Sequence, residues 1–448
     1  SNRNAGTGKT LTPAAAITDG NGGLNYTVTL VTNTTGVINK ALLTVTATTN
    51  TKTYDGLTTA AAVPTITSGA LQGTDTAVLA ETYANKDAGT GKTLTPTATI
   101  TDGNGGLNYT VTLVNNITGV INAAPITVTA STNSKTYDGT TSAAALPTIT
   151  SGALVGGDTA VLSEIYSNRN AGTGKTLTPA AAITDGNGGL NYTVTLVNNT
   201  TGVINAAALT VTATGVNRVY DGTATATVTL ADNRVAGDVL TLTNTAALFL
   251  DKNVGTAKPV SVTGIAVSGT DAANYTLSNA TASTAANITA RPITVTAATN
   301  TKTYDGNATA LALPTITSGA LAGGDTAVLA ETYADKNFGT GKTLTPTATI
   351  TDGNGGLNYT VTLVTNVAGV INKALLTVTA STNTKTYNGN TGAAALPTIT
   401  SGALVGGDTA VLAETYADKN FGTGKTLTPT ATITDGNGGL NYTVTLVN

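Results

Sequence analysis

The chain has 448 residues, a net charge of −3 and no cysteine, methionine, histidine or tryptophan. Disulfides, thiolate nucleophiles, imidazole bases and the usual zinc ligands are therefore excluded, and we expect no enzyme activity and no cofactor. The chain lacks a basic stretch for phosphates and an apolar run of about 18 residues, so we expect neither nucleic-acid binding nor a membrane span. Only 10% of residues are charged, and the abundance of threonine and valine favours β-structure over disorder.

Three markers recur with a common period of 83 or 84 residues. The first is Tyr-Asp-Gly, which becomes Tyr-Asn-Gly in its fifth copy. The second is Asn-Tyr-Thr, and the third is Leu-Thr-Val-Thr-Ala or Ile-Thr-Val-Thr-Ala. The predicted domains are 1–40 (the C-terminal part of a repeat), 41–123, 124–206, 207–290 (a divergent repeat), 291–373 and 374–448 (a nearly complete repeat). The period is too long for a solenoid coil, so each repeat is expected to be a small domain with its own core.

In chain order, repeat 41–123 opens with alternating threonine and aliphatic residues, which is the period of a strand. Further short apolar or alternating runs follow, separated by Gly, Asn and Asp. Pro64 and Pro96 fall inside two of these runs, which favours edge positions or bulges there. The predicted strands are 43–47, 52–54, 60–67, 75–83, 92–101, 107–113 and 120–121.

These short strands and the lack of helical periodicity predict an all-β fold: a tandem array of small antiparallel β-sandwich domains, immunoglobulin-like or β-grasp-like in outline. No Gly/Ser-rich or Pro-rich spacer separates one repeat from the next. Pro125 and Pro292 at two junctions would stiffen the connection. We therefore expect an elongated, semi-rigid rod.

Tyr-Asp-Gly is the main structural motif of the repeat. Its tyrosine is expected to pack on the domain, and its aspartate to accept backbone N–H groups in an Asx turn. Asn388 fits this role, since asparagine can accept the same bonds. The motif residues are Tyr54, Asp55, Gly56, Tyr137, Asp138, Gly139, Tyr220, Asp221, Gly222, Tyr304, Asp305, Gly306, Tyr387, Asn388 and Gly389.

A second glycine-rich motif, Asp-Gly-Asn-Gly-Gly, is a hairpin turn with some likeness to a calcium loop. One carboxylate among glycines is far short of the ligands that a calcium loop supplies. We therefore prefer the turn and keep weak calcium binding as the alternative, with candidate residues Asp19, Asp102, Asp185, Asp352 and Asp435.

Gly-Thr-Gly-Lys-Thr resembles the end of a phosphate-binding loop, but the first glycine of that motif is replaced by lysine or arginine and no helix follows. A turn between strands is the better interpretation. The lysine of this motif and the asparagine of Asn-Tyr-Thr could also form an isopeptide bond, although nothing in the sequence places them together.

The Tyr-Asp-Gly, Asn-Tyr-Thr and Leu-Thr-Val-Thr-Ala markers, together with the segment SGTDAANYTLSNATASTAANITA at 268–290, resemble the YDG/MBG-type tandem repeats of large bacterial surface adhesins. The resemblance covers the whole chain. It implies a secreted, extracellular protein of the filamentous-haemagglutinin-like, two-partner-secretion type, located at the bacterial cell surface, in which such arrays act as stalks.

Three functions remain open. The favoured hypothesis is a structural stalk or fibre segment of a cell-surface adhesin, which projects a distal binding domain whose ligand is unknown. The first alternative is a subunit of a self-assembling extracellular filament or sheath, held by strand pairing between identical chains. The second is direct glycan or matrix binding through tyrosine-bearing faces. The expected partners are neighbouring repeats of the same chain.

Overall fold

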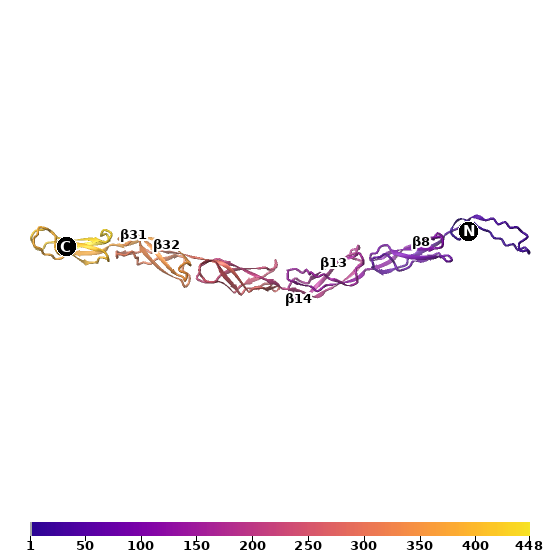
Figure 1. The fold of residues 1–448 in the computed structure, drawn as a ribbon, viewed down its shortest axis with the longest axis horizontal. Coiled ribbons are helices and arrows are strands. Elements are labelled where there is room, and N and C mark those ends of the chain that lie inside the picture. Colours follow the sequence, from indigo (N-terminus) through magenta and orange to yellow (C-terminus); the bar gives the residue numbers. More distant parts are fainter. Residues whose placement is uncertain (1) are drawn as a thin grey trace. The chain divides into compact units, whose positions relative to one another are not determined.

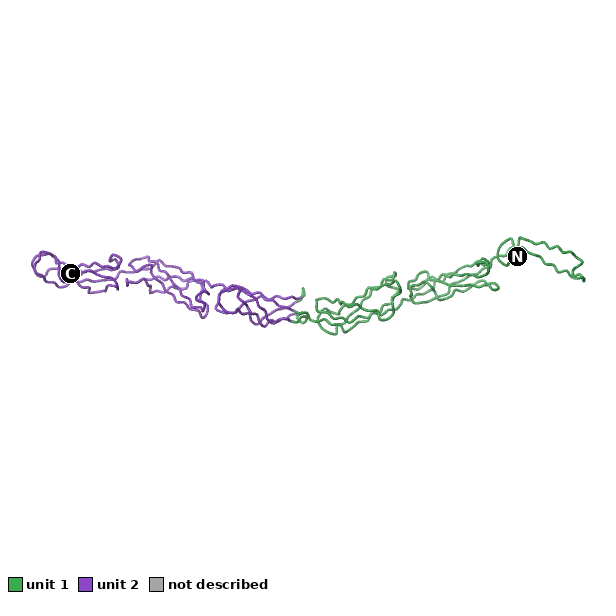
Figure 2. Tube along the Cα trace, viewed as in Figure 1, with its two compact units in different colours: residues 1–208, 235–238, 270–276 green, residues 209–234, 239–269, 277–448 purple. Residues whose placement is uncertain are grey.

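The computed structural model describes residues 2–448. It divides into two compact units, which Figure 2 colours separately. Unit 1 comprises 1–208, 235–238 and 270–276, and unit 2 comprises 209–234, 239–269 and 277–448. Both units consist of strands, and the predicted all-β tandem array is confirmed. Among residues 2–448, no helix is long and apolar enough to cross a bilayer.

Repeat 41–123 shows the plan that the regular repeats share. Its seven strands are β3 (Ala41–Thr46), β4 (Thr51–Thr53), β5 (Thr65–Ser68), β6 (Thr76–Tyr83), β7 (Gly89–Thr101), β8 (Tyr109–Val114) and β9 (Asn116–Asn122). They form a three-stranded sheet of order β5-β3-β8 and a four-stranded sheet of order β4-β9-β7-β6. The first and last segments of the repeat therefore contribute to both sheets.

The other repeats place their strands at matching positions (Figure 1). Residues before 41 form β1 (Gly6–Leu11) and β2 (Asn33–Ile38). Repeat 124–206 contains β10 (Ala124–Thr129), β11 (Ser134–Thr136), β12 (Thr148–Ser151), β13 (Thr159–Tyr166), β14 (Gly172–Thr184), β15 (Tyr192–Val197) and β16 (Asn199–Asn205). Repeat 291–373 contains β27 (Arg291–Thr296), β28 (Thr301–Thr303), β29 (Thr315–Ser318), β30 (Thr326–Tyr333), β31 (Gly339–Thr351), β32 (Tyr359–Val364) and β33 (Asn366–Asn372). Residues 374–448 form β34 (Ala374–Thr379), β35 (Thr398–Ser401), β36 (Thr409–Tyr416), β37 (Leu427–Thr434) and β38 (Tyr442–Val447).

The divergent repeat has shorter and more numerous strands. They are β17 (Ala207–Leu209), β18 (Val211–Val216), β19 (Arg218–Val219), β20 (Thr227–Asp232), β21 (Thr241–Thr243), β22 (Ala246–Phe249), β23 (Gly255–Thr263), β24 (Ala266–Ser268), β25 (Tyr275–Leu277) and β26 (Thr281–Thr289). A short 3-10 helix, η1 (Ala272–Asn274), precedes β25.

The sheets are mixed, so the antiparallel pairing that the sequence favoured holds for only some of the strand pairs. β6 and β7 pair antiparallel, as do β7 and β9. In contrast, β3 pairs with β8 in parallel, and so does β4 with β9. A parallel pair needs a long crossover between its strands. Here the whole middle of the repeat is that crossover, which is why short-range patterns do not reveal it.

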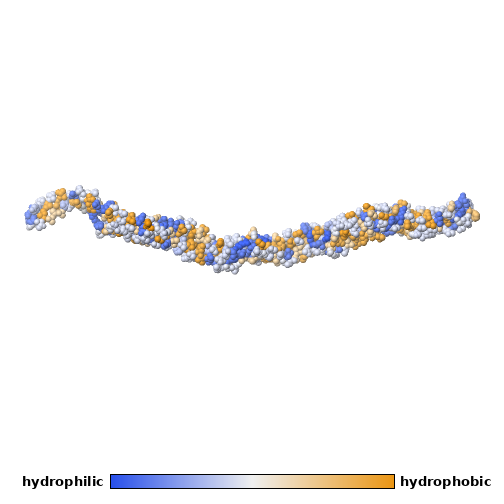
Figure 3. All heavy atoms as spheres, turned by 180° about the vertical axis from the view of Figure 1, so that it is seen from behind, coloured by the Kyte–Doolittle hydropathy of each residue, from blue (hydrophilic) through white to orange (hydrophobic). Residues whose placement is uncertain are grey.

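The two sheets enclose a core of alternating inward-facing residues. Leu43, Ile100 and Tyr109 come from three different strands and are all buried. The opposite faces carry threonines and scattered aliphatic residues, so polar and apolar patches alternate over the surface in Figure 3. This alternation follows from the period of two residues in a strand, which places successive side chains on opposite faces.

The two prolines within predicted strands have different outcomes. Pro64 lies just before β5, so the strand predicted at 60–67 begins only at Thr65. Pro96 does lie inside β7, opposite Glu81 of β6. The pairing of β7 with β9 ends at Leu94. One edge of β7 is therefore free at Pro96, where a residue without an N–H group is tolerated.

Candidate functional site at the repeat junctions

Each Tyr-Asp-Gly motif forms a turn that is closed by the side chain of its own aspartate, or of Asn388 in the fifth copy. In the first copy, Asp55 Oδ1 accepts the backbone N–H of Leu57 at 3.0 Å and Lys52 Nζ at 2.7 Å. Gly56 has a φ of 76°, which suits a residue without a Cβ. In the fifth copy Asn388 Oδ1 accepts Lys385 Nζ at 3.1 Å, so an amide oxygen replaces the carboxylate.

The turn holds the aspartate in its charged form. Burial works to raise the pKa of Asp138, but bonds from Lys135 and Thr140 outweigh it and lower that pKa to about 2. The other aspartates of the motif, Asp55, Asp221 and Asp305, also have pKa values below the usual 3.8. Each of these four turns thus places an ionised aspartate directly after the tyrosine of the motif.

The tyrosine of the motif points into the following repeat. Tyr54 is 3% exposed, and its ring meets that of Tyr192 edge to face, with centroids 5.5 Å apart and planes at 77°. The two hydroxyls converge on one carboxylate, because Tyr54 donates to Asp158 Oδ2 at 2.9 Å and Tyr192 donates to the same atom at 2.7 Å. The backbone N–H of Val155 donates to the Tyr192 hydroxyl at 2.7 Å. Two rings and one carboxylate therefore join the two repeats.

We call this arrangement the tyrosine junction: the tyrosine of one Tyr-Asp-Gly motif, the tyrosine of the next Asn-Tyr-Thr, and the aspartate between them in space. Its geometry recurs with centroid separations of 5.5 Å in all four cases. The members are Tyr54, Tyr192 and Asp158; Tyr137, Tyr275 and Asp238; Tyr220, Tyr359 and Asp325; and Tyr304, Tyr442 and Asp408. The first two lie in unit 1 and the last two in unit 2.

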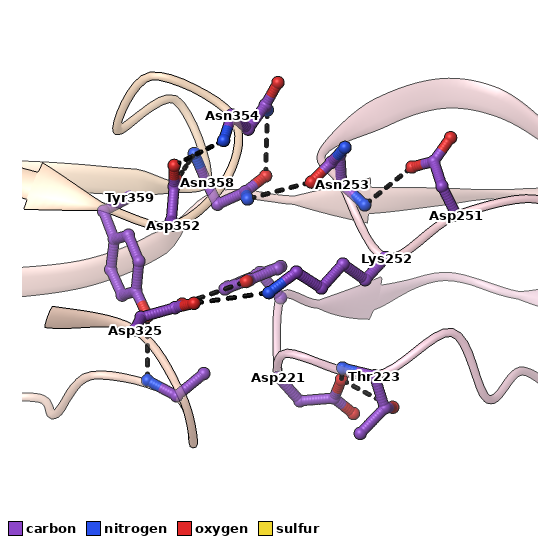
Figure 4. A network of polar contacts seen from close by, with 12 residues as sticks. Asp221, Thr223, Asp251, Lys252, Asn253, Asp325, Asp352, Asn354, Asn358 and Tyr359 are labelled. Carbon is purple, nitrogen blue, oxygen red and sulfur yellow. Dashed lines mark hydrogen bonds and ion pairs between the residues drawn. The ribbon is translucent and has the colours of Figure 1, made fainter.

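A cation covers three of the tyrosine junctions. Lys86 Nζ lies 5.9 Å from the centroid of Tyr54, and the Arg169 guanidinium lies 6.0 Å from that of Tyr137. In the close-up of Figure 4, Lys252 reaches over the third junction and pairs with Asp325 at 3.3 Å. Arg169 similarly pairs with Asp238 at 2.8 Å. These cations balance a carboxylate that is buried between two rings.

The surroundings of the tyrosine junctions shift the pKa values of both partners. Burial, followed by contact with an aspartate, raises the pKa of Tyr137 and Tyr304 to about 12. Burial also works to raise the pKa of Asp238 and Asp325, but the tyrosine hydroxyls and the nearby cation lower both below the usual value. The neutral tyrosines and the ionised carboxylate are therefore the forms that stabilise the junction.

A second contact between neighbouring repeats runs through the asparagine of Asn-Tyr-Thr, at the four tyrosine junctions and also between residues 1–40 and repeat 41–123. Asn191 Oδ1 accepts the backbone N–H of Ala88 from the preceding repeat at 2.7 Å. The same bond recurs from Ala5 to Asn108, Ala171 to Asn274, Val254 to Asn358 and Phe338 to Asn441. Figure 4 shows Asn358 in this position, close to Asn253.

The Asp-Gly-Asn-Gly-Gly loop positions that asparagine. Asp102 Oδ1 accepts the N–H groups of Asn104 at 2.7 Å and Gly106 at 2.8 Å, and its Oδ2 accepts that of Asn108 at 3.0 Å. The loops of Asp19, Asp185, Asp352 and Asp435 are built the same way. Burial opposes these bonds, but together they lower the pKa of Asp102.

The hydrogen bonds of the loop carboxylate are relevant to the weak calcium binding that the sequence left open. The three N–H donors point at the carboxylate, whereas a cation site needs several oxygen ligands converging on one point. Among residues 2–448, no cluster of three or more Asp and Glu side chains has the geometry to hold a metal ion. The loop carboxylate therefore serves the turn and, through Asn108 and its counterparts, the junction.

The Gly-Thr-Gly-Lys-Thr segment starts strand β7 and its counterparts rather than a phosphate loop. Lys92 Nζ contacts Asn85 Oδ1 at 2.5 Å, across the turn before β7. The asparagine of Asn-Tyr-Thr, Asn108, instead meets the backbone of Ala5. Within one repeat, the lysine and the asparagine that an isopeptide bond between these two motifs would require therefore have different hydrogen-bond partners.

The sequence reasoning missed the aspartate at the centre of each tyrosine junction. Asp158, Asp325 and Asp408 directly precede the Thr-Ala-Val-Leu strand, so they look like ordinary turn residues. A usable signal exists, since this aspartate recurs in the same register as the two tyrosines, including Asp238 in the divergent repeat. Recurrence in a repeat that has otherwise drifted marks a residue with a specific contact.

Comparison with known proteins gives a family but no characterised relative. A search of curated protein sequences finds no significant match. A structural search matches the Drosophila N-cadherin EC1-4 crystal structure at 9% identity and a TM-score of 0.17, covering 73% of this chain and 100% of that one. At that TM-score the likeness carries no argument. The YDG domain family model matches residues 39–118, 122–201, 205–284, 289–367 and 372–448. The chain is therefore a tandem array of five YDG domains and belongs to the YDG domain family.

Proposed function

We propose that this array is the stalk of an extracellular bacterial surface adhesin, in which it projects a distal binding domain away from the cell. The observation that carries the proposal is the tyrosine junction. A chain that only linked two domains would need no buried contact between repeats, whereas here each of the four tyrosine junctions holds two rings, a carboxylate and a backbone bond. Fixed boundaries suit a spacer that must keep its length.

The core supports the same role because it runs through the boundary. In unit 1, Leu94 and Ile121 of one repeat share a buried cluster with Ile126 and Tyr192 of the next. In unit 2, Leu344 and Tyr442 share an equivalent cluster. Burial at about 25 cal/mol per Å² of apolar surface stabilises each boundary, so the neighbouring repeats of the chain are each other's partners.

Filament formation is a second candidate, and the free edge of the four-stranded sheet favours it. β6 is the outermost strand of its sheet, and Val78 on it is 71% exposed. Val161, Val328 and Val411 are similarly exposed at equivalent positions. An edge of this kind can pair with another chain. Analytical ultracentrifugation over a range of concentrations separates the two, since the stalk proposal expects monomers and the filament requires growing assemblies.

Glycan or matrix binding through tyrosine-bearing faces has less support. The rings of Tyr54, Tyr83 and Tyr109 are all less than 5% exposed, because they pack inside a repeat or at a junction. Stacking on a sugar needs an open aromatic face. A glycan-array experiment with the purified chain would restore this alternative if it gave saturable binding.

The stalk proposal can be tested by display on cells. The chain is placed between an outer-membrane anchor and a small reporter binding domain, and capture of the reporter's partner is measured on cells with a dense surface polysaccharide layer. Capture is expected to need the chain and to fall when Tyr54, Tyr137, Tyr220 and Tyr304 are all changed to Ala. A flexible Gly/Ser linker of equal residue number is the control. Equal capture with this linker would contradict the proposal.

A further inference from the structure

The ends of each regular repeat (41–123, 124–206 and 291–373) are paired in parallel. In repeat 41–123, the six residue pairs of β3 and β8 run from Ala41↔Tyr109 to Thr46↔Val114. The three pairs of β4 and β9 run from Thr51↔Val120 to Thr53↔Asn122. The first segment of the repeat thus lies alongside its last segment over nearly its whole length.

Backbone bonds continue this pairing between and beyond the strands. Ala47 N–H donates to Val114 O at 2.9 Å, where the chain passes from one sheet to the other. At the end of the ladder, Tyr54 N–H donates to Asn122 O at 2.8 Å. The hydroxyls of Thr49 and Thr118 meet at 2.7 Å in the gap. The two terminal segments therefore form one continuous parallel ladder.

The direction of pairing determines how tension acts on the repeat. The chain comes in at the start of β3 and leaves at the end of β9, so tension pulls the two paired segments in opposite directions along their own axes. The hydrogen bonds run across the strands, and many must break together before the segments can slide. A hairpin opened from its free ends would instead lose its bonds one at a time.

The divergent repeat has a shorter ladder. Its counterparts of β3 and β8 are β17 and β25, each with three residues in place of six. Its counterpart of the β4–β9 pair is β19–β26, with two residue pairs, Arg218↔Ile288 and Val219↔Thr289. Residues 211–216 form β18, which pairs antiparallel with β20.

We propose that the regular YDG repeats are mechanical clamps sheared along their parallel terminal strands, and that the divergent repeat 207–290 is the one that yields first under tension. In a stalk, unfolding of the one weak repeat would lengthen the array under tension while the other repeats stay folded. This biological meaning rests on the proposed function, but the mechanical property belongs to the folded repeats themselves.

Constant-force magnetic tweezers on the whole chain, held through tags at its two ends, test the proposal. Each repeat that unfolds should release about 300 Å of chain, from 83 residues at about 3.6 Å each. The divergent repeat is marked by 20 added Gly/Ser residues between Thr243 and Asn244, which lengthen its step by about 70 Å. Among the four complete repeats, 41–123, 124–206, 207–290 and 291–373, the long step is expected first, at a rate roughly tenfold or more above the other three. Long steps scattered at random among the others would overturn the proposal.

Two substitutions in a regular repeat test the ladder itself. Val203→Pro removes the N–H that donates to Asn133 O at 3.0 Å in the parallel ladder. Leu177→Ala empties part of the core but leaves every ladder bond in place. With Val203→Pro, repeat 124–206 should unfold as early as the divergent repeat. With Leu177→Ala, it should still unfold later, together with the other regular repeats. The same rate for both variants would contradict clamping, while the display experiment would still decide the stalk role.

Discussion

At each tyrosine junction, one carboxylate accepts hydrogen bonds from two tyrosine hydroxyls that belong to neighbouring repeats. Asp158 accepts the hydroxyl of Tyr192, and Tyr54 approaches the same carboxylate from the preceding repeat. Hydrogen bonds to a charged acceptor contribute more than neutral ones, about 1.5–3 kcal/mol each. The buried edge-to-face ring pair adds about 0.5–1.5 kcal/mol. The chemistry of the boundary is thus concentrated in three side chains.

Removal of one hydroxyl should loosen one boundary. Tyr54→Phe keeps the ring and deletes the bond to Asp158, so local opening should become easier by about 1.5–3 kcal/mol. Hydrogen exchange at the Ala88 amide, which donates across the same junction, should accelerate roughly tenfold to hundredfold. Tyr387→Phe is the matched control, since Tyr387 occupies the same motif but is 65% exposed. Equal effects of the two substitutions at Ala88 would refute this assignment.

The junctions should also respond to pH at two extremes. Asp238 and Asp325 have lowered pKa values in the folded chain. Their contribution to stability is therefore present above pH 3.8, the pKa in the unfolded chain, and is lost as the pH falls through the lower pKa of the folded chain. The pKa values of Tyr137 and Tyr304 are raised in the folded chain. Their contribution to stability is therefore present below pH 10 and is lost between pH 10 and about pH 12. The stability of the array should therefore be flat between about pH 5 and 9.

Tyrosinate absorbance checks the alkaline limit directly. Tyr137, Tyr192, Tyr304 and Tyr359 should titrate near pH 12 and only with loss of structure. Circular dichroism recorded on the same samples separates titration from unfolding. Ionisation of all fifteen tyrosines near pH 10 in a chain that is still folded would show that the junction tyrosines are not buried.

Among the strands, one glycine lets the last strand of a repeat pass close to a buried tyrosine ring. Gly202 in β16 lies opposite Lys175 of β14, and a Cβ there would come within 2.8 Å of Lys175 O and 3.0 Å of Tyr166 Cε1. The strand can pass over the tyrosine ring only without a side chain. The same position is glycine in the other regular repeats, as Gly119 and Gly369.

Gly202→Ala should therefore destabilise repeat 124–206 by about 1–3 kcal/mol, as expected for overpacking. Gly156→Ala is the control in the same repeat, because its Cβ would meet nothing within 4 Å and its φ is not positive. That substitution should be neutral or stabilise by up to about 1 kcal/mol. Differential scanning calorimetry compares the two, and a control that is as unstable as Gly202→Ala would rule out the steric explanation.

The sequence predicted the strands better than their partners. Alternation located β3 and β8 within a few residues, since side-chain burial imposes that period. Parallel pairing of these two strands joins residues 68 positions apart, and no local pattern encodes a contact at that range. The tyrosine of Tyr-Asp-Gly was expected to pack on its own domain. Its actual partner lies 138 residues further on, at Tyr192, and only a repeated register could have pointed there.

Across the chain, the contacts between neighbouring repeats recur as regularly as the strands within them. The divergent repeat illustrates this, because its strands have shortened while Tyr220, Asp238 and Tyr275 remain at their junctions. Selection for a core alone would not keep these three side chains. Neighbouring repeats within each unit are therefore expected to hold a fixed orientation, which the proposed stalk role would need.

Pulsed electron paramagnetic resonance between adjacent repeats tests that expectation most directly. The chain has no cysteine, so spin labels can be attached at Val78→Cys and Val161→Cys, two equivalent positions that are 71% and 72% exposed. A single narrow distance distribution is predicted, which broadens with Tyr54→Ala and stays narrow with Tyr387→Ala. A broad distribution in the native chain, or one that ignores Tyr54→Ala, would contradict the claim that the tyrosine junctions fix the array.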